Sequence, residues 1–100
     1  MAKEIRWTTE AQATYQKVIT YLEENWTDKE VGNFITISNK IISFISENPL
    51  MFRKSNKNNV HEALITKHNL LLYRVKPNHI ELLTFWDTRQ NPKKKFKRKK

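Results

Sequence analysis

The C-terminal end of the chain, FWDTRQNPKKKFKRKK over residues 85–100, gathers the side chains best suited to binding phosphate. Arg89 comes first, and the planar guanidinium group of an arginine can hold a phosphate through two parallel hydrogen bonds. Residues 88–100 contain eight lysines and arginines and no acidic residue, whereas residues 1–87 hold 11 basic and 10 acidic residues. The net charge of +9 is therefore concentrated at this end, which we expect to bind phosphate backbones or acidic protein surfaces.

Pro92 divides this segment into two parts with different expected roles. We interpret the residues before it as the end of the last strand, which positions Arg89, and residues 93–100 as a flexible basic tail. The side chains expected to bind a nucleic acid or another target are Lys93, Lys94, Lys95, Phe96, Lys97 and Arg98. Lysines and arginines add affinity by releasing counterions, and an aromatic ring can stack on a base. The alternative is a solvated tail that makes no ordered contact.

Two residues earlier in the chain, His61 and Arg74, are candidates for chemistry at a phosphate. An imidazole titrates near neutrality, so His61 can act as a proton shuttle, although the pattern also allows an ordinary surface position. Arg74 can add to a phosphate-binding surface beside Arg89. It can equally form a cross-strand ion pair with Glu62 or Glu81. The three histidines are not spaced as ligands on one element, so we expect no metal site and no cofactor.

Length and composition limit the class of protein. One hundred residues, of which 38% are hydrophobic, are enough for one domain with a single core. The absence of cysteine excludes disulfides and thiolate metal sites, and it fits a reducing cytoplasm. No segment has the length of the apolar region of a signal peptide or of a transmembrane helix. We therefore expect a cytoplasmic protein that does not associate with a membrane.

Hydrophobic periodicity predicts six secondary-structure elements. In chain order they are a strand at 4–8, helices at 9–26 and 27–48, and strands at 60–66, 69–76 and 79–87. Each helix opens with the spacing of a capping box, Thr9 with Gln12 in the first and Thr27 with Glu30 in the second. The segment 48–59 lacks periodicity and predicts a loop, whose start we expect Met51 and Phe52 to anchor to the core.

These elements predict an α+β domain over residues 1–92. The two helices are joined by almost nothing, so they should form an antiparallel hairpin. Short connections make the last three strands antiparallel neighbours, and the apolar density of the second of them, NLLLYRVK, predicts a central place in the sheet. The expected architecture is an N-terminal strand and a helical hairpin packed on a largely antiparallel sheet, in the order β-α-α-β-β-β.

This succession resembles the RelE/ParE toxins of bacterial type II toxin–antitoxin systems, a family that includes plasmid stabilisation proteins. The local sequences that carry the resemblance are ENP at the end of the second helix, HNLLLYRV across the hairpin, and IELLTFWDTRQNP as a last strand ending in Arg-x-x-Pro. The resemblance covers residues 4–92. It implies a cytoplasmic toxin that arrests growth and is neutralised by a cognate antitoxin protein, which folds around it.

The family contains two kinds of activity, and the resemblance leaves both open. RelE-like members enter the ribosome and cleave messenger RNA, whereas ParE-like members poison DNA gyrase and cleave nothing themselves. Arg89 matches the phosphate-stabilising arginine of the nucleases, and His61 stands where many relatives carry an arginine. With Arg74 these are the candidate catalytic residues. The stretch QNPKKKFK after Arg89 lacks the tyrosine or histidine that the RelE pattern uses as acid or base, so we favour ParE-like action.

A third hypothesis is a small nucleic-acid-binding module that is not toxic. It requires base-stacking aromatic side chains on an exposed face of the sheet. Phe85 and Trp86 alternate along their strand, so at most one of them lies on that face, and no RNP-like motif supports the hypothesis. Binding without toxicity would distinguish such a module from a toxin.

Overall fold

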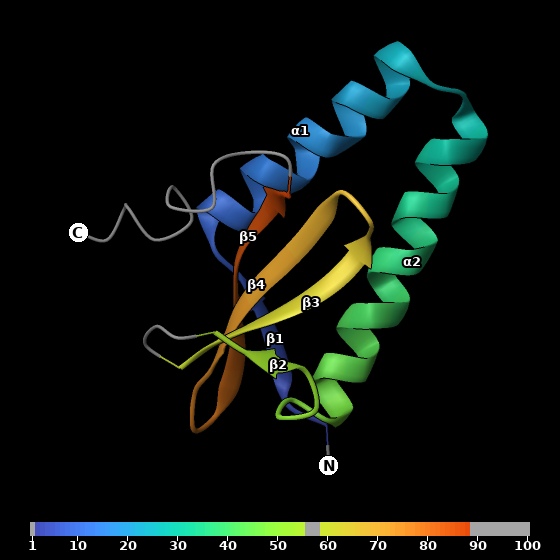
Figure 1. Ribbon diagram of the computed structural model, residues 1–100. Coiled ribbons are helices and arrows are strands. Elements are labelled where there is room, and N and C mark those ends of the chain that lie inside the picture. The colour runs from blue at the N-terminus through green and yellow to red at the C-terminus, as the bar shows by residue number, and fades with distance from the viewer. Residues whose placement is uncertain (1, 56–58, 89–100) are drawn as a thin grey trace.

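The computed structural model describes residues 2–55 and 59–88. Its elements are β1 (Glu4–Trp7), α1 (Thr9–Asn25), α2 (Asp28–Glu47), β2 (Arg53–Lys54), β3 (Val60–Thr66), β4 (Asn69–Val75) and β5 (His79–Asp87). The strands form one five-stranded sheet in the order β1-β5-β4-β3-β2. Figure 1 shows the two helices as a hairpin whose turn projects past the ends of the strands. The predicted α+β class and the central place of the strand beginning at Asn69 are confirmed.

The first strand pairs with the last, and this pairing is parallel. Ile5 lies opposite Ile80 and Trp7 lies opposite Leu82, whereas the other neighbouring strands are antiparallel. The chain then passes straight from β1 into α1 at Thr8. The sheet is therefore largely antiparallel, as predicted, with one parallel edge.

Thr8 makes that passage possible by binding in two directions. Its hydroxyl donates to the carbonyls of Leu82 and Leu83 on β5, at 2.8 and 3.1 Å. The same oxygen accepts from the backbone N–H of Ala11 at 3.0 Å, which makes Thr8 the N-cap of α1. The predicted cap at Thr9 was wrong by one residue, because the sequence offers two threonines in a row and only Thr8 has the extended backbone of a cap.

The edge of β5 beyond β1 is covered by α1. The hydroxyl of Thr14 accepts a hydrogen bond from the backbone N–H of Phe85 at 2.9 Å and donates to the carbonyl of Glu10 at 2.8 Å. An unpaired strand edge exposes N–H and C=O groups that can pair with another chain. Thr14 thus accepts a hydrogen bond from one N–H of this edge, at the position where a longer β1 would have paired with β5.

The core lies between the helical hairpin and one face of the sheet. Its buried hydrophobic residues are Ala11, Ile19, Phe34, Ile45, Ala63, Ile65, Leu71, Tyr73, Ile80, Leu82 and Phe85. Near the start of α1 the rings of Trp7, Tyr15, Phe34 and Phe85 contact one another, with centroids 4.9–6.4 Å apart. Such pairs stabilise beyond the area they bury. The predicted apolar stripes of the helices form this interface, except that Trp26 at the end of the first stripe is 57% exposed and Ile35 in the second is 37% exposed.

The second helix has the predicted residue at its N-cap, but the cap lacks the capping-box bond from a backbone N–H to the Thr27 hydroxyl. Thr27 is the N-cap, and its hydroxyl donates to the carboxylate of Glu30 instead of accepting a backbone N–H. The hydrogen bond favours the ionised form of that carboxylate, so the pKa of Glu30 lies below its ordinary value.

The segment after α2 is more ordered than a loop. The sequence prediction missed β2, a two-residue edge strand in which Arg53 lies opposite Glu62 and Lys54 lies opposite His61. Two exposed, charged residues give no alternation from which a strand could be predicted. Phe52 packs against the core, but Met51 is 60% exposed, so the expectation that both anchor the segment was wrong for Met51. No helix in the described ranges is long and apolar enough to span a membrane.

Candidate functional site

The face of the sheet that points away from the helices, here called the outer face, carries paired charges. Because Tyr73 faces the core, its neighbour Arg74 points to the outer face. The guanidinium group of Arg74 lies 3.8 Å from the carboxylate of Glu81 on β5, and both side chains are about one-third exposed. At the other edge, Arg53 lies 4.0 Å from Glu62. Of the two alternatives for Arg74, the cross-strand ion pair is present, and its partner is Glu81.

The outer face continues onto β1. Arg6 lies opposite Glu81 in the parallel register and forms an ion pair with Glu4 at 3.0 Å, in which both side chains are more than half exposed. The hydrogen bond and the charge of Arg6 together lower the pKa of Glu4. A row of guanidinium groups and carboxylates therefore crosses the outer face from one edge of the sheet to the other. The carboxylates of this row compete with any phosphate for the guanidinium groups beside them.

His61 lies on the opposite face of the sheet from Arg74. It is 5% exposed, and it is in register with Tyr73, on which its ring is stacked with centroids 5.3 Å apart. Its Nδ1 atom lies 3.1 Å from the carbonyl oxygen of Phe52, an acceptor, so this nitrogen carries the proton. The surface position allowed for His61 is wrong, and the sheet separates this residue from Arg74.

Tyr73 completes the buried cluster around His61. Its hydroxyl donates to the carbonyl of Pro49 at 2.7 Å, and burial raises the pKa of the phenol well above its usual value. Phe52 packs edge-on against the same ring. Both polar side chains of this cluster are therefore engaged in holding the segment after α2 against β3 and β4. This structural role accounts for His61 and Tyr73, so neither residue needs a role in proton transfer to explain its position.

The predicted residues Arg89, Lys93, Lys94, Lys95, Phe96, Lys97 and Arg98 lie outside the described part of the chain, as does the domain boundary at Pro92. The position of Thr88, the residue that precedes Arg89, is nevertheless fixed by two hydrogen bonds. Thr88 donates from its backbone N–H to the carbonyl of His68 at 2.9 Å and from its hydroxyl to the carbonyl of Lys67 at 3.1 Å. The end of β5 is thereby fixed to the turn between β3 and β4. Within residues 2–55 and 59–88 there is no cluster of three potential metal ligands.

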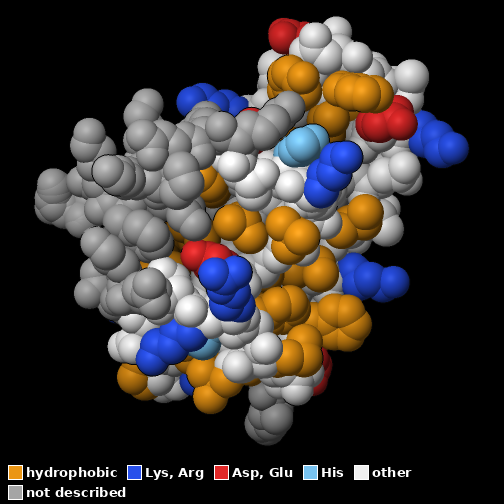
Figure 2. Space-filling view, viewed as in Figure 1, with side chains coloured by type: hydrophobic (Ala, Val, Ile, Leu, Met, Phe, Trp, Pro, Cys, Tyr) orange, Lys and Arg blue, Asp and Glu red, His pale blue; other side chains and the backbone are white. Residues whose placement is uncertain are grey.

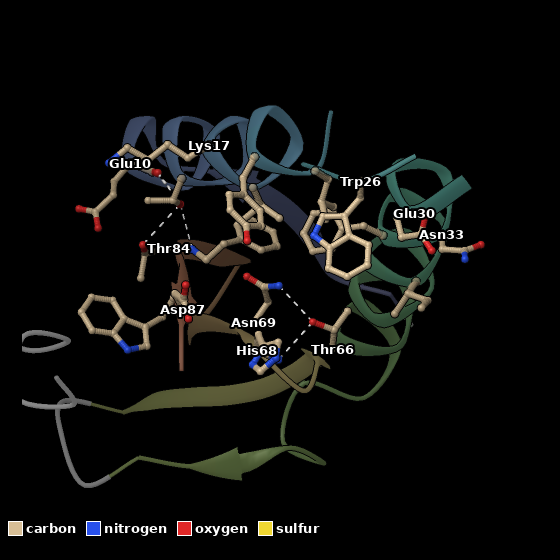
Figure 3. Close-up of a pocket in the computed structure, with 18 residues that line it drawn as sticks. Glu10, Lys17, Trp26, Glu30, Asn33, Thr66, His68, Asn69, Thr84 and Asp87 are labelled. Atoms are coloured by element: carbon tan, nitrogen blue, oxygen red, sulfur yellow. Dashed lines mark hydrogen bonds between the residues drawn. The ribbon is translucent and has the colours of Figure 1, made fainter. Parts of the chain in front are cut away.

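A groove of about 630 Å³ lies between the helical hairpin and the ends of the strands. The helices and the residue that follows α1 contribute Glu10, Thr14, Lys17, Val18, Tyr21, Leu22, Trp26, Glu30, Asn33, Phe34 and Ile37. The sheet and its β3–β4 turn contribute Thr66, His68, Asn69, Thr84, Phe85, Trp86 and Asp87. Figure 3 shows these side chains converging on the space between α1, the start of α2 and the turn between β3 and β4. The groove exists because the hairpin projects past the sheet.

The floor of the groove is apolar and its outer end is exposed. Phe34 and Phe85 are 2% and 4% exposed, whereas Tyr21 and Trp26 are 47% and 57% exposed. Figure 2 shows hydrophobic side chains at the surface near the turn that joins the helices. Sequence reasoning missed this groove, because its walls come from four separate segments. The one available signal was Trp26, which extends the apolar stripe of α1 beyond the length that the sheet can cover.

No protein-family model and no curated protein matches the sequence. Solved structures do match it. The chromosomal ParDE toxin–antitoxin system of P. aeruginosa includes a chain that is 15% identical, with a TM-score of 0.73 over 86% of this chain and 96% of that one. The YoeB dimer of Staphylococcus aureus is 21% identical, with a TM-score of 0.58 over 84% and 94% of the two chains. A copper-bound mutant toxin from Helicobacter pylori is 18% identical, with a TM-score of 0.60 over 85% and 93%.

Identities of this size show a shared fold. The matched structures include YoeB–YefM toxin–antitoxin complexes from Staphylococcus aureus, so this fold occurs in a toxin bound to its antitoxin. The order of elements and the near-complete coverage agree with the resemblance noted in the sequence. The chain therefore has the RelE/ParE-type fold of the ParE and YoeB toxins.

Proposed function

We propose that this chain is the toxin of a type II toxin–antitoxin pair, which arrests growth in the cytoplasm and is neutralised by a cognate antitoxin. The proposal is supported by the fold shared with ParDE and YoeB proteins and by the sequence motifs that run through it in the same order. A fold alone does not fix a function. The further support must come from the residues themselves.

We favour ParE-like action, in which the toxin poisons DNA gyrase by binding and does not cleave RNA. The observation that carries this choice is the separation of His61 from Arg74 on opposite faces of the sheet. Cleavage of RNA through its own 2′-hydroxyl needs a base, an acid and cations around a single phosphate. With His61 buried against Tyr73, these two candidate residues cannot reach the same phosphate. Poisoning by binding needs only an exposed surface.

RelE-like cleavage of ribosome-bound messenger RNA is the second candidate, because the outer face does hold groups for such chemistry. Arg74 and Arg53 are cations, and the carboxylates of Glu81 and Glu62 beside them are candidate general bases. In that case His61 has no catalytic part, and Arg89 is expected to act together with the outer-face residues. These two functions predict different first events in the cell.

The groove is our candidate for the site where the antitoxin binds. Its apolar floor and exposed aromatic rim can accept the hydrophobic side of an amphipathic helix. Antitoxins of this class are disordered until they bind, and ordering on a preformed groove suits such a segment. Occupation of the groove also brings the partner to Asp87, two residues before Arg89.

A pulse-labelling experiment tests the proposed function. The full chain is induced without a partner gene, and incorporation of labelled precursors into DNA, RNA and protein is followed separately. We expect DNA synthesis to fail first, with double-strand breaks. Early loss of protein synthesis with cleaved messages would instead establish the RelE-like candidate. Continued growth with soluble, folded protein would contradict the toxin proposal and leave the non-toxic binding module.

Matched variants sharpen this experiment. Arg74→Ala removes a cation of the outer face, and His61→Gln removes the imidazole on the inner face while keeping a side chain that can donate to the Phe52 carbonyl. Under the proposed function, His61→Gln retains the activity of the parent chain as long as it folds, which circular dichroism verifies. Loss of activity in folded His61→Gln would show that the imidazole acts chemically despite its burial.

A further inference from the structure

A second hollow, of about 490 Å³, lies where β1 meets β5 and the turn that joins β4 to β5. The residues that give it its chemistry are Arg6, Trp7, Lys76, Pro77, His79 and Glu81. None of the described residues that line this hollow also lines the groove between the hairpin and the sheet. The ParE-like action proposed above gives this hollow no role.

Basic side chains outnumber acidic ones among the described residues of this hollow. Arg6, Lys76 and His79 line it, together with the carboxylate of Glu81. That carboxylate already lies 3.8 Å from the guanidinium group of Arg74. Within residues 2–55 and 59–88, the ammonium group of Lys76 makes no hydrogen bond and no ion pair. The hollow therefore offers positive charge to an anion.

The turn that carries Lys76 is held in place by Lys3. The ammonium group of Lys3 donates to the carbonyls of Lys76 and Pro77, at 3.1 and 2.9 Å. The backbone of Lys3 is in turn bound to Ser46 in α2, through its N–H to the Ser46 carbonyl at 3.0 Å and its carbonyl from the Ser46 hydroxyl at 2.7 Å. These bonds fix the turn and add a cation behind it. A site that is fixed before binding loses less conformational entropy when its ligand arrives.

The groups of this hollow suit a ligand that carries a phosphate at one end. An ammonium group binds phosphate as a point charge, and a guanidinium group adds directed donors. Arg6 uses its Nε and Nη2 atoms on Glu4, at 3.0 and 3.3 Å, and keeps the donors of Nη1. Trp7 and Pro77 add apolar surface beside these cations. The volume lies within the range of small-molecule sites, roughly 300–1,000 Å³, so it can hold more than a phosphate alone.

We propose that this hollow binds a nucleotide through its phosphate group, with Lys76 and Arg6 as the residues that hold the phosphate. A free mononucleotide and the phosphorylated end of a nucleic-acid strand carry this same group, and the experiment below distinguishes them. Glu4 competes with the phosphate for Arg6, because both of its carboxylate oxygens accept from that guanidinium group. The inference does not rest on the toxin proposal.

The test is a titration of the full chain with nucleotides, followed by NMR through the amide signals of residues 76–79. Signals of individual residues separate this hollow from the basic residues 93–100, which attract any anion. We expect AMP, GMP, CMP or UMP to shift these amides to saturation, inorganic phosphate to compete, and adenosine to leave them unchanged. A short oligonucleotide with a 5′-phosphate that binds more tightly than the mononucleotides would assign the strand end as the ligand, and the reverse order would assign the free nucleotide.

Two variants should change the affinity in opposite directions. Lys76→Gln should weaken binding about tenfold, because it removes a cation of the site. Glu4→Gln should strengthen it about threefold, because it releases Arg6 from a competing carboxylate. Lys40→Gln and Glu47→Gln make the same two charge changes at exposed positions of α2 outside the hollow, and neither should alter the affinity. Circular dichroism verifies that each variant is folded.

Three results would overturn the inference. Shifts that leave residues 76–79 unmoved would place nucleotide binding elsewhere on the chain. Equal effects of Lys76→Gln and Lys40→Gln would show a response to overall charge only, and equal binding of adenosine and AMP would exclude recognition of the phosphate. An unchanged affinity in Glu4→Gln would remove Arg6 from the site. Growth arrest is scored separately by the induction experiment, so the loss of either proposal leaves the other standing.

Discussion

The ring of His61 lies nearly flat on the ring of Tyr73, with centroids 5.3 Å apart and an angle of 17° between their planes. The pair joins β3 to β4 and, through the carbonyls of Phe52 and Pro49, joins both strands to the segment that leaves α2. A histidine and a tyrosine on neighbouring strands of a toxin-like fold invite a catalytic interpretation. Their hydrogen bonds instead assign them to structure.

Removal of the Tyr73 hydroxyl should therefore cost stability and leave activity unchanged. Tyr73→Phe deletes the donor to the Pro49 carbonyl while keeping the ring against His61, and a net loss of about 1 kcal/mol in the free energy of unfolding is expected. Urea denaturation measures it. Tyr21→Phe is the control, because Tyr21 is 47% exposed. Equal effects of the two changes would show that the buried hydrogen bond contributes nothing.

Thr14 should matter more than an ordinary helical threonine. Thr14→Val keeps the shape of the side chain but leaves the N–H of Phe85 at the covered edge of β5 without its acceptor, which should cost about 1–3 kcal/mol of unfolding free energy. Thr20→Val in the same helix removes only an exposed contact with Gln16 and serves as the control. Thermal or urea unfolding that ranks the two variants alike would contradict the edge-covering role.

The start of α2 should show a pH dependence with a defined sign. Because the pKa of Glu30 is lowered in the folded chain by its bond to Thr27, this carboxylate stabilises the fold above its unfolded-state pKa. That stabilisation is lost as the pH falls through the lower, folded-state pKa. Thr27→Ala should move the pKa of Glu30 back up toward its ordinary value. Titration of the Glu30 side chain by NMR measures this, and an unchanged midpoint would rule out the Thr27 bond as its cause.

Arg89 remains the first residue to test for toxicity. Arg89→Ala should relieve growth arrest by about tenfold or more in surviving cells, because a bidentate contact to phosphate cannot be replaced by an alanine. Replacement of Lys93, Lys94 and Lys95 by serine should weaken any nucleic-acid binding and its dependence on salt. Full toxicity of a folded Arg89→Ala chain, compared at equal protein levels by immunoblot, would remove Arg89 from the site.

The sequence was sufficient for most of the fold. The helices and the three long strands repeat their apolar residues over many positions, and patterns of this length indicate the type of an element well. The central place of β4 was also predicted correctly. The order of the strands at the edges was beyond this reasoning. The parallel pairing of β1 with β5 joins segments about 75 residues apart. An alternating pattern of only four residues does not indicate which strand they pair with.

The candidate site could be predicted only in part, for two physical reasons. Both faces of β4 are buried, with Leu72 at 2% and Tyr73 at 0% exposure, so the alternation that normally reveals the core side was absent, and with it the orientation of Arg74. The groove is a property of the space left between elements. The pattern predicted Trp26 to be the last core residue of the first helix, because a hydrophobic pattern cannot show where the sheet beneath a helix ends.

The parallel pairing of β1 with β5 also constrains how the chain can fold during its own synthesis. β1 pairs with β5, about 75 residues later in the chain, so the first strand lacks this sheet partner until β5 has been synthesised. Contacts between distant segments slow folding, since a long loop must close before they form. The helical hairpin is synthesised early, and its apolar side stays exposed until the sheet forms. A nascent chain of this protein should thus stay incomplete, and without its finished outer face, until β5 is made.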